Sequence, residues 1–538
     1  MRRPDRRPHD PSSRHSSVGR PIALWLIIIS CVVIAGCAVG PDNGPPLVVG
    51  DDAHGGGTSS SVQAPSGPPA LQSPRADLGW RDCRDDLVRS YGFATPASDV
   101  ILECASFRTA ATPGTQGLDT VTVGAVRARL TRTAREATPV VLTTGTDLPS
   151  AAALMLYAAG PNHEQLLDHP VVALNRRGTG NSDPIDCLTR TERSTLVADG
   201  FQPPPAASGA QRSDRLAAAA ASAADGCTET LSPHQLDYTS AFAAADIEKL
   251  RTIWQVDRLG LVGVGQGGDV ALAYAGLYPS RVARLVLDTP TPYRTDTKDR
   301  AQNRAAGVQA ALDGFADQCR AVDCSLGADP GAAVRRLLDR AAAGDLSGFS
   351  DTDVLAALTT SLAVGPLDRR SSVTAAADIL SAAGAGDTSR LQTAVSTAHA
   401  LRDGDGQLVG RCNDVAATVG RSTVDQLLGD WTTQYRLTGT TTALDLLRCN
   451  GWSAGPPAPT VTGLDVPVLL LSAAADTLNG NGGIEAVTKA LVGARVSVGA
   501  IGWQGVGYSA WARSDCAGGA TRAYLDTGTA PPSTDCPA

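Results

Sequence analysis

A turn that could present a nucleophile follows an apolar stretch near the middle of the chain. Residues 259–264 alternate glycine with aliphatic residues, as a buried strand would, and the turn Gly263-Val264-Gly265-Gln266-Gly267 closes them. In the pattern G-x-S-x-G, such a turn between a strand and a helix exposes its central serine for attack on an acyl carbon. The centre here is Gly265, which has no side chain. The turn has the spacing of an acyl-transfer site without its nucleophile.

Segments that could hold this turn in place alternate between strand and helix patterns. The apolar runs at 138–145 and 169–175 are typical of buried parallel strands, and residues 119–130 alternate like a half-exposed antiparallel strand. A helix, a second helix after the turn and a further strand are expected at 237–254, 269–278 and 284–288. Alternation with short connections predicts an α/β fold with a doubly wound, mostly parallel sheet.

A long stretch without strand signals interrupts this alternation. Between 291 and 450 the apolar residues follow helical spacing, and a strand pattern returns at 465–476. We therefore expect an all-helical cap insertion over 291–450. The core would then come in two parts, 79–290 and 451–538.

The first residues have the pattern of an export signal. Arginines precede the apolar stretch 22–36, which is too short to span a bilayer comfortably. It ends in Ile34-Ala35-Gly36-Cys37, which resembles the bacterial lipobox. We expect residues 1–36 to be a lipoprotein signal peptide, and Cys37 to be lipidated, for instance by palmitate. The protein would then lie on the outer face of the bacterial cell membrane. The alternative is an ordinary secretory signal with a chance cysteine.

Residues 37–78 are rich in glycine, proline and serine and have little to bury. This composition predicts a disordered tether.

Cysteine content fits an exported chain. Of the 12 cysteines, Cys31 and Cys37 lie at the signal, and the even remainder predicts disulfides. We expect neighbouring cysteines to pair: Cys83 with Cys104, Cys187 with Cys227, Cys319 with Cys324, Cys412 with Cys449, and Cys516 with Cys536.

Charge and spacing argue against two classes of function. The net charge of −8 leaves no basic face for nucleic acid. No Cys or His cluster has the spacing of a zinc site, so neither a metal nor another cofactor is expected.

Several segments carry a resemblance to a known family. HPVVALNRRGTGNSDPIDC (169–187) resembles the R-G-x-G-x-S-x-P-x-x-C segment of the secreted tripeptidyl-aminopeptidase-like proteases of actinomycetes, a branch of the α/β-hydrolases. LYPSRVARLVLD (277–288) and the closing pattern after 466, with its two terminal cysteines, are similar to that family too. The resemblance covers roughly 80–536, is weakest in the helical insertion, and implies an α/β-hydrolase fold.

The resemblance also implies where a catalytic triad would stand. The serine position is Gly265, the acid position is Asp476, and the histidine position is Tyr508. The oxyanion loop corresponds to residues 144–150, where Asp147 would put a carboxylate near the developing negative charge. Gly145, Thr146 and Gln266 are the expected oxyanion and pocket residues.

The order of residues gives a second argument against catalysis. In this fold the triad runs serine, acid, histidine along the chain. The last histidine is His399, upstream of Asp476, so no histidine follows the acid. We predict that the catalytic triad is degenerate and that no complete set of catalytic residues remains.

The sequence is compatible with two functions. The favoured one is a non-catalytic binding or scaffolding lipoprotein, with Gly265 and Tyr508 reshaping the cleft floor to contact a peptide or acyl-containing envelope ligand, or a protein partner. The alternative is an active exported serine peptidase or esterase with a displaced nucleophile such as Ser509 or Ser150.

Overall fold

The computed structural model describes residues 67–114, 119–202 and 209–538. The expected signal peptide, Cys37 and the tether up to residue 66 lie outside these residues.

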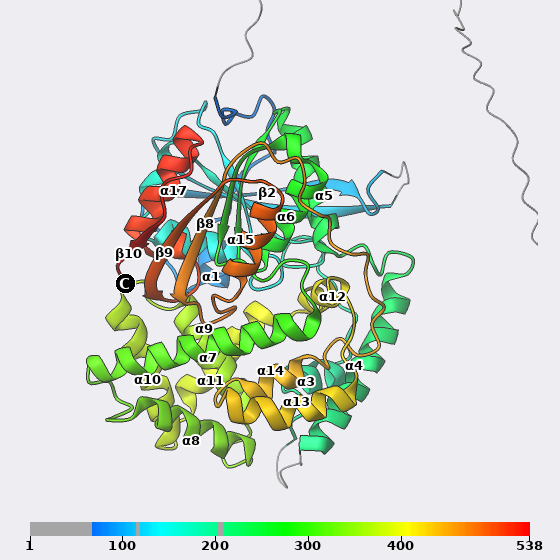
Figure 1. Cartoon of the computed structure of the whole chain (residues 1–538), viewed down its shortest axis with the longest axis vertical. Coiled ribbons are helices and arrows are strands. Elements are labelled where there is room, and N and C mark those ends of the chain that lie inside the picture. The colour runs from blue at the N-terminus through cyan, green and yellow to red at the C-terminus, as the bar shows by residue number, and fades with distance from the viewer. Residues whose placement is uncertain (1–66, 115–118, 203–208) are drawn as a thin grey trace, which may run out of the picture. The chain divides into compact units, whose positions relative to one another are not determined.

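A single sheet organises the described residues, with the strand order β1-β2-β3-β5-β4-β6-β7-β8-β9-β10 (Figure 1). The pairs from β5 to β10 are parallel, and β1, β2 and β3 pair antiparallel at one edge. The strand bounds are β1 Arg81–Asp82, β2 Val100–Ala110, β3 Thr120–Leu130, β4 Val140–Thr143, β5 Val171–Leu174, β6 Leu259–Val264, β7 Val282–Asp288, β8 Val468–Ala475, β9 Val498–Val506 and β10 Thr534–Cys536. The predicted mostly parallel α/β sheet is confirmed.

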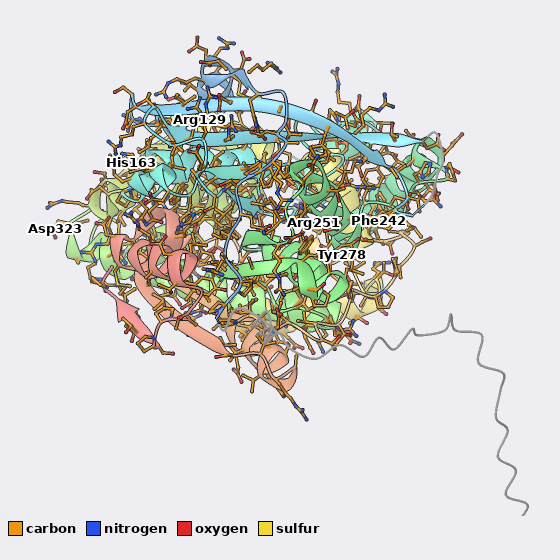
Figure 2. All side chains as sticks on the ribbon, turned by 90° about the horizontal axis from the view of Figure 1, so that it is seen from above. Arg129, His163, Phe242, Arg251, Tyr278 and Asp323 are labelled. Atoms are coloured by element: carbon orange, nitrogen blue, oxygen red, sulfur yellow. A yellow bond between two sulfur atoms is a disulfide. The ribbon has the colours of Figure 1, made fainter. Side chains whose placement is uncertain are left out.

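Ion pairs fasten the antiparallel edge. Arg127 and Arg129 of β3 both bind Glu103 of β2, at N–O distances of 2.8 and 3.0 Å. Figure 2 shows Arg129 at this edge of the molecule.

Helices cover both faces of the sheet. Successive residues of a strand face opposite sides of the sheet. In β4, Leu142 therefore packs with the apolar residues of α2, α16 and α17, and Val141 packs with those of α5, α6 and α15. The bounds outside the cap are α1 Arg84–Ser90, α2 Ser150–Ala159, α5 Ser240–Trp254, α6 Gly267–Leu277, α15 Gly483–Gly493, α16 Ala510–Arg513 and α17 Asp515–Thr527, with 3₁₀ turns at His163–Leu167 and Pro279–Arg281. The sheet is doubly wound.

The cap helices gather at one end of the sheet (Figure 1). Between β7 and β8 the described elements are all helical, namely α7 Thr297–Ala321, α8 Pro330–Ala342, α9 Asp351–Val364, α10 Arg369–Gly384, α11 Ser389–Arg402, α12 Asp405–Asn413, α13 Arg421–Gln434 and α14 Gly439–Asp445.

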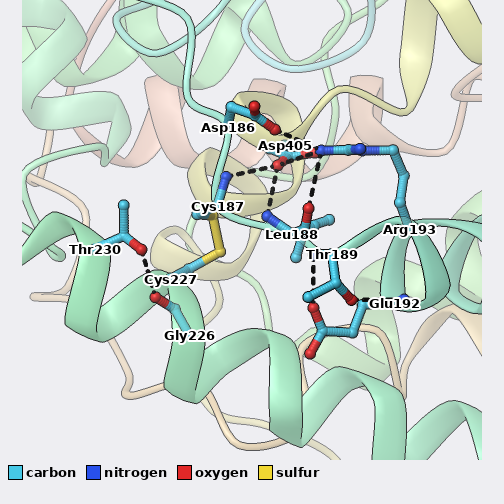
Figure 3. Close-up of a disulfide and its surroundings, with 10 residues drawn as sticks. All are labelled: Asp186, Cys187, Leu188, Thr189, Glu192, Arg193, Gly226, Cys227, Thr230 and Asp405. Atoms are coloured by element: carbon cyan, nitrogen blue, oxygen red, sulfur yellow. Dashed lines mark hydrogen bonds and ion pairs between the residues drawn. A yellow bond between two sulfur atoms is a disulfide. The ribbon is translucent and has the colours of Figure 1, made fainter.

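Two helices that precede the elbow also belong to the cap, which corrects the predicted boundary at residue 291. α3 (Arg190–Val197) and α4 (Gly209–Leu231) share an apolar cluster with α12, α13 and α14. Asp405 of α12 accepts hydrogen bonds from the backbone of Cys187 and Leu188, and from Arg193 of α3 (Figure 3). The cap is therefore built from two separate stretches of the chain.

Five disulfides join the cysteines in the predicted neighbouring pairs. The Cys187–Cys227 bond ties the segment before α3 to α4 (Figure 3). Cys516–Cys536 fastens β10 to α17.

The folded part begins earlier than predicted. Gln72 exchanges hydrogen bonds with Asp257, the backbone of Arg75 donates to Trp254, and Pro69 accepts from Arg284. These polar contacts hold residues 69–75 against the folded core. The prediction that the disordered tether extends to residue 78 is therefore wrong. In the part of the chain that the structure describes, no helix has the length and apolar character needed to cross a bilayer.

The segment with the strongest family resemblance has a structural role. Arg177 is buried and forms a two-pronged ion pair with Asp246 of α5, at 2.5 and 2.9 Å. It also donates to the carbonyl of Ala111, at 2.6 Å. Ser182 bonds the backbone of Gly124 and Asn175 rather than facing a cleft. This loop locks β3 and β5 to α5.

Candidate functional site

The turn after β6 has the conformation of a nucleophile elbow. Gly265 adopts φ of +57°, where a residue with a Cβ is strained, and its N–H donates to the carbonyl of Asp288 at 2.9 Å. α6 starts two residues later, so the turn points its centre toward the carboxyl edge of the sheet. The geometry that would present a serine is intact around a glycine.

Asp147 occupies the space that a side chain at this turn would need. A Cβ added to Gly265 would lie 2.0 Å from Asp147 Oδ2 and 2.5 Å from Asn479 Nδ2. Both distances are far below van der Waals contact. No larger residue fits at 265 while Asp147 and Asn479 stay in place.

The same carboxylate oxygen fills the position of an oxyanion. In an acyl-transfer site, the backbone N–H after the nucleophile stabilises the negative oxygen. Here the N–H of Gln266 donates to Asp147 Oδ2 at 2.8 Å, and Asn479 Nδ2 donates to it at 2.7 Å. Burial raises the pKa of Asp147, although these two hydrogen bonds lower it. The oxyanion position is occupied by the protein itself.

The loop after β4 presses Asp147 against the elbow. Gly145 has φ of +62°, and a Cβ there would lie 2.6 Å from the backbone of Gln266. The hydroxyl of Thr146 donates to the side chain of Gln266. The structure thus brings the three expected oxyanion residues, Gly145, Thr146 and Gln266, together around Asp147.

Asp476 lies where a triad acid would, directly after β8. Its Oδ1 accepts from the backbone N–H groups of Leu478 and Asn479, at 2.8 and 2.9 Å. Its Oδ2 is buried and has no partner among the described residues. Burial raises the pKa of Asp476 to about 7 despite these hydrogen bonds. The oxygen that a histidine would bind is left unpaired.

Tyr508 cannot replace that histidine. Its ring is fully buried, and its hydroxyl lies 3.2 Å from the carbonyl of Val264 and 3.4 Å from Asp147 Oδ2. Burial, followed by the charge of Asp147, raises its pKa well above the usual value. The phenol is therefore a protonated hydrogen-bond donor at neutral pH and not a base.

The two serines that could serve as displaced nucleophiles are both buried in structural hydrogen bonds. Ser509 donates to Asp288 at 2.7 Å and caps α16 by accepting from Ala512. Ser150 accepts from the backbone N–H of Thr144 at 3.2 Å. Neither has a histidine among the hydrogen-bond partners that the described residues provide.

His399 is the histidine that lines the cavity above the elbow. Its two ring nitrogens bind Asp403 and Asp353, at 2.8 and 2.9 Å. Burial lowers its pKa, but the hydrogen bonds to Asp353 and Asp403 outweigh it and raise the pKa to about 9. Since it is protonated at neutral pH, His399 cannot accept a proton as a general base.

A cavity of about 90 Å³ lies above the elbow, between the core and the cap. From the core it is lined by Thr146, Asp147, Gln266, Thr477, Leu478 and Asn479. Neither Gly265 nor Tyr508 lines it. The expectation that these two residues reshape the cleft floor is wrong, because Asp147 and Asn479 cover them. No group of His, Cys, Asp or Glu among the described residues is arranged to hold a metal ion.

Comparisons with known proteins agree with this architecture. Residues 155–343 match the model of the alpha/beta hydrolase fold, and residues 435–536 match the model of the TAP-like protein. The fold and these matches define an α/β-hydrolase, as the resemblance predicted. Within that class, residues 435–536 are similar to the TAP-like proteins, so the predicted peptidase-like homology is confirmed for this part of the chain.

Named relatives match only part of the chain. Serine protease Hip1 of Mycobacterium tuberculosis is 33% identical over 92 residues, which is 17% of this chain and 18% of that protein. Tripeptidyl aminopeptidase of Streptomyces lividans is 29% identical over 118 residues, 22% of this chain and 21% of that protein. The alignments thus span about a fifth of these relatives.

Solved structures show lower similarity. A bacterial membrane phospholipase A is 13% identical, with a TM-score of 0.36, over 82% of this chain and 90% of that one. An esterase from Rhodococcus is 14% identical, with the same TM-score, over 79% of this chain and 99% of that one. A likeness at this TM-score says nothing about function.

Restoring a serine should be destabilising because Asp147 stands in its place. We expect Gly265→Ser to lower the free energy of unfolding by about 2–4 kcal/mol, through strain and steric overlap. The control Gly327→Ser, also at positive φ but with open space around it, should cost only about 1–2 kcal/mol. Asp147→Ala removes the overlapping carboxylate. A double-mutant cycle of Gly265→Ser and Asp147→Ala, measured by urea unfolding, should therefore give a coupling free energy of about 1–3 kcal/mol. Strictly additive effects would contradict the overlap.

The buried acid should make stability depend on pH. The pKa of Asp476 in the folded chain, about 7, lies above its unfolded value, so the folded state binds more protons and loses stability as pH rises from about 4 to 7. Asp476→Asn keeps an oxygen for Leu478 and Asn479 but carries no charge. We expect it to be about 1–3 kcal/mol more stable than wild type at pH 8, and nearly equal at pH 4, in urea unfolding. A difference that does not change with pH would show that Asp476 is not held protonated.

Proposed function

We propose that this protein is an exported, lipid-anchored envelope protein that uses its α/β-hydrolase fold to bind rather than to hydrolyse. The main observation in its support is the hydrogen bond that the N–H of Gln266 donates to the Asp147 carboxylate, at 2.8 Å. A substrate carbonyl oxygen would have to displace a buried carboxylate from that donor.

Three independent requirements of acyl transfer are unmet at this site. The nucleophile position is a glycine, the base position is a buried phenol, and the oxyanion donor is already in use. Losing one oxyanion donor alone costs about 10²–10³ in rate. The combined loss leaves no route to significant hydrolysis at the elbow.

A binding role is supported by the cavity above the elbow. The cavity above the elbow is roofed by cap helices that keep a packed apolar core of their own. Clefts at the carboxyl ends of parallel strands are the usual ligand sites of open α/β sheets. A peptide or an acyl-containing envelope component is the class of ligand we propose for it, with a protein partner on the cap as the alternative occupant.

Export is supported by the cysteines. Five disulfides are expected in an oxidising compartment and rare in a reducing one. The lipobox-like sequence before Cys37 supports attachment to the membrane by a lipid on that residue.

The purified protein should not hydrolyse aminoacyl-nitroanilides or nitrophenyl esters, and a fluorophosphonate probe should not label it. The double change Gly265→Ser with Tyr508→His should recover little activity, because Asp147 still fills the oxyanion position. Ser509→Ala and Ser150→Ala serve as matched controls for displaced nucleophiles. Wild-type turnover or labelling that either control abolishes would favour an active peptidase or esterase.

Cys37→Ala should move the protein from the membrane fraction to the soluble fraction of cells, because stable anchoring needs the acyl chains that this residue would carry. Cys31→Ala, in the same leader, is the matched control and should leave the distribution unchanged. Fractionation followed by immunoblotting gives the readout. A Cys37→Ala protein that stays with the membrane would exclude this anchor.

A further inference from the structure

Several arginines gather in the roof of the cavity above the elbow. Four guanidinium groups from separate cap segments line it: Arg304 of α7, Arg402 at the end of α11, Arg411 of α12 and Arg448 after α14. Arg304 and Arg448 come from other parts of the chain than Arg402 and Arg411, so the fold gathers the four arginines at one place.

Carboxylates in the roof are already used by other cations. Asp199 binds Arg448 at 2.8 Å, Asp403 binds His399 at 2.8 Å, and Asp445 binds Arg304 at 3.0 Å. Asp147, below them, is held by Gln266 and Asn479.

Two of the arginines are only weakly paired. The closest hydrogen bond of Arg402 is one of 3.5 Å to Thr359, and no carboxylate of the described residues lies within 4.0 Å of it. Arg411 reaches Asp445 only at 3.6 Å, and its Nε is buried without a partner. Burial, together with the charge of Arg304, lowers the pKa of Arg402 to about 10, and burial lowers that of Arg411. Both stay charged at neutral pH.

The two weakly paired cations lie close together. The guanidinium of Arg411 donates to the main-chain carbonyl of Arg402 at 3.4 Å, and the charge of Arg411 lowers the pKa of Arg402. Thr438, Thr441 and Thr442 line the same cavity. Half-buried guanidinium groups with free donors are suited to carboxylate or phosphate, which they bind through charge-assisted hydrogen bonds.

We propose that Arg402 and Arg411 form an anion subsite, at which the cavity binds the carboxylate or phosphate group of an organic ligand. This inference rests on the proposed binding role and specifies the chemistry of the ligand. The anionic group of the ligand would bind to the cap and not to the elbow, where Asp147 already accepts from the N–H of Gln266.

Calorimetric titration of the purified protein tests this subsite. The probes are inorganic phosphate and N-acetyl-trialanine, with the C-terminal amide of the same peptide as the uncharged control. We expect at least one anionic probe to bind, the amide to bind at least tenfold more weakly than the acid, and Arg402→Gln and Arg411→Gln each to weaken binding by about 10- to 100-fold. Arg436→Gln, an exposed cap arginine outside the cavity, is the matched control and should leave affinity unchanged.

The outcomes separate the sources of the anion. Stronger binding of phosphate indicates a phosphorylated ligand, and stronger binding of the peptide acid indicates a carboxylate. Binding of neither probe, or binding that both arginine substitutions leave unchanged, overturns the proposal. If Arg402→Gln does not fold, Arg402→Lys, which keeps the charge but not the planar fork, must weaken binding for the proposal to stand. A failure here leaves the hydrolysis assays unaffected, so it would not by itself refute the absence of catalysis.

Discussion

The carboxylate of Asp147 joins four loops at the carboxyl edge of the sheet. It comes from the loop after β4, and it accepts from Gln266 after β6 and from Asn479 after β8, while Tyr508 after β9 lies within 3.4 Å. Removing this acceptor would leave buried donors unpaired, which proteins rarely tolerate. Since a Cβ at residue 265 would overlap the same oxygen, glycine at 265 and aspartate at 147 depend on each other. The departures from a working triad therefore form one packed arrangement.

That arrangement separates the elbow from the cavity above it. Asp147 and Asn479 cover Gly265 and Tyr508, so the cavity is bounded by a polar floor and an arginine-rich roof and not by the two elbow residues. Asp476 keeps one oxygen on backbone donors and leaves the other unpaired and buried. The fold thus retains the frame of an α/β-hydrolase while the charged groups that face the cavity come mainly from the cap.

The sequence predicted the frame well because its signals are local. Apolar runs such as 138–145 mark buried strands, and the glycine spacing around 265 marks the elbow. The association of α3 and α4 with the cap could not be predicted, because an amphipathic helix does not say which neighbour covers its apolar face. The carboxylate of Asp147 was expected near the oxyanion position. The overlap of this carboxylate with any side chain at residue 265, and the burial of Tyr508 beneath it, depend on distances that spacing along the chain does not contain.

The most direct measurement is a crystal structure of the protein grown with a peptide boronic acid, which supplies an oxygen for an oxyanion site. If Asp147 closes the oxyanion position, its Oδ2 stays within hydrogen-bond distance of the Gln266 N–H, as in the 2.8 Å contact, and no boronate oxygen binds that donor. A structure with Asp147 turned away and a boronate oxygen bound to the Gln266 N–H would contradict it.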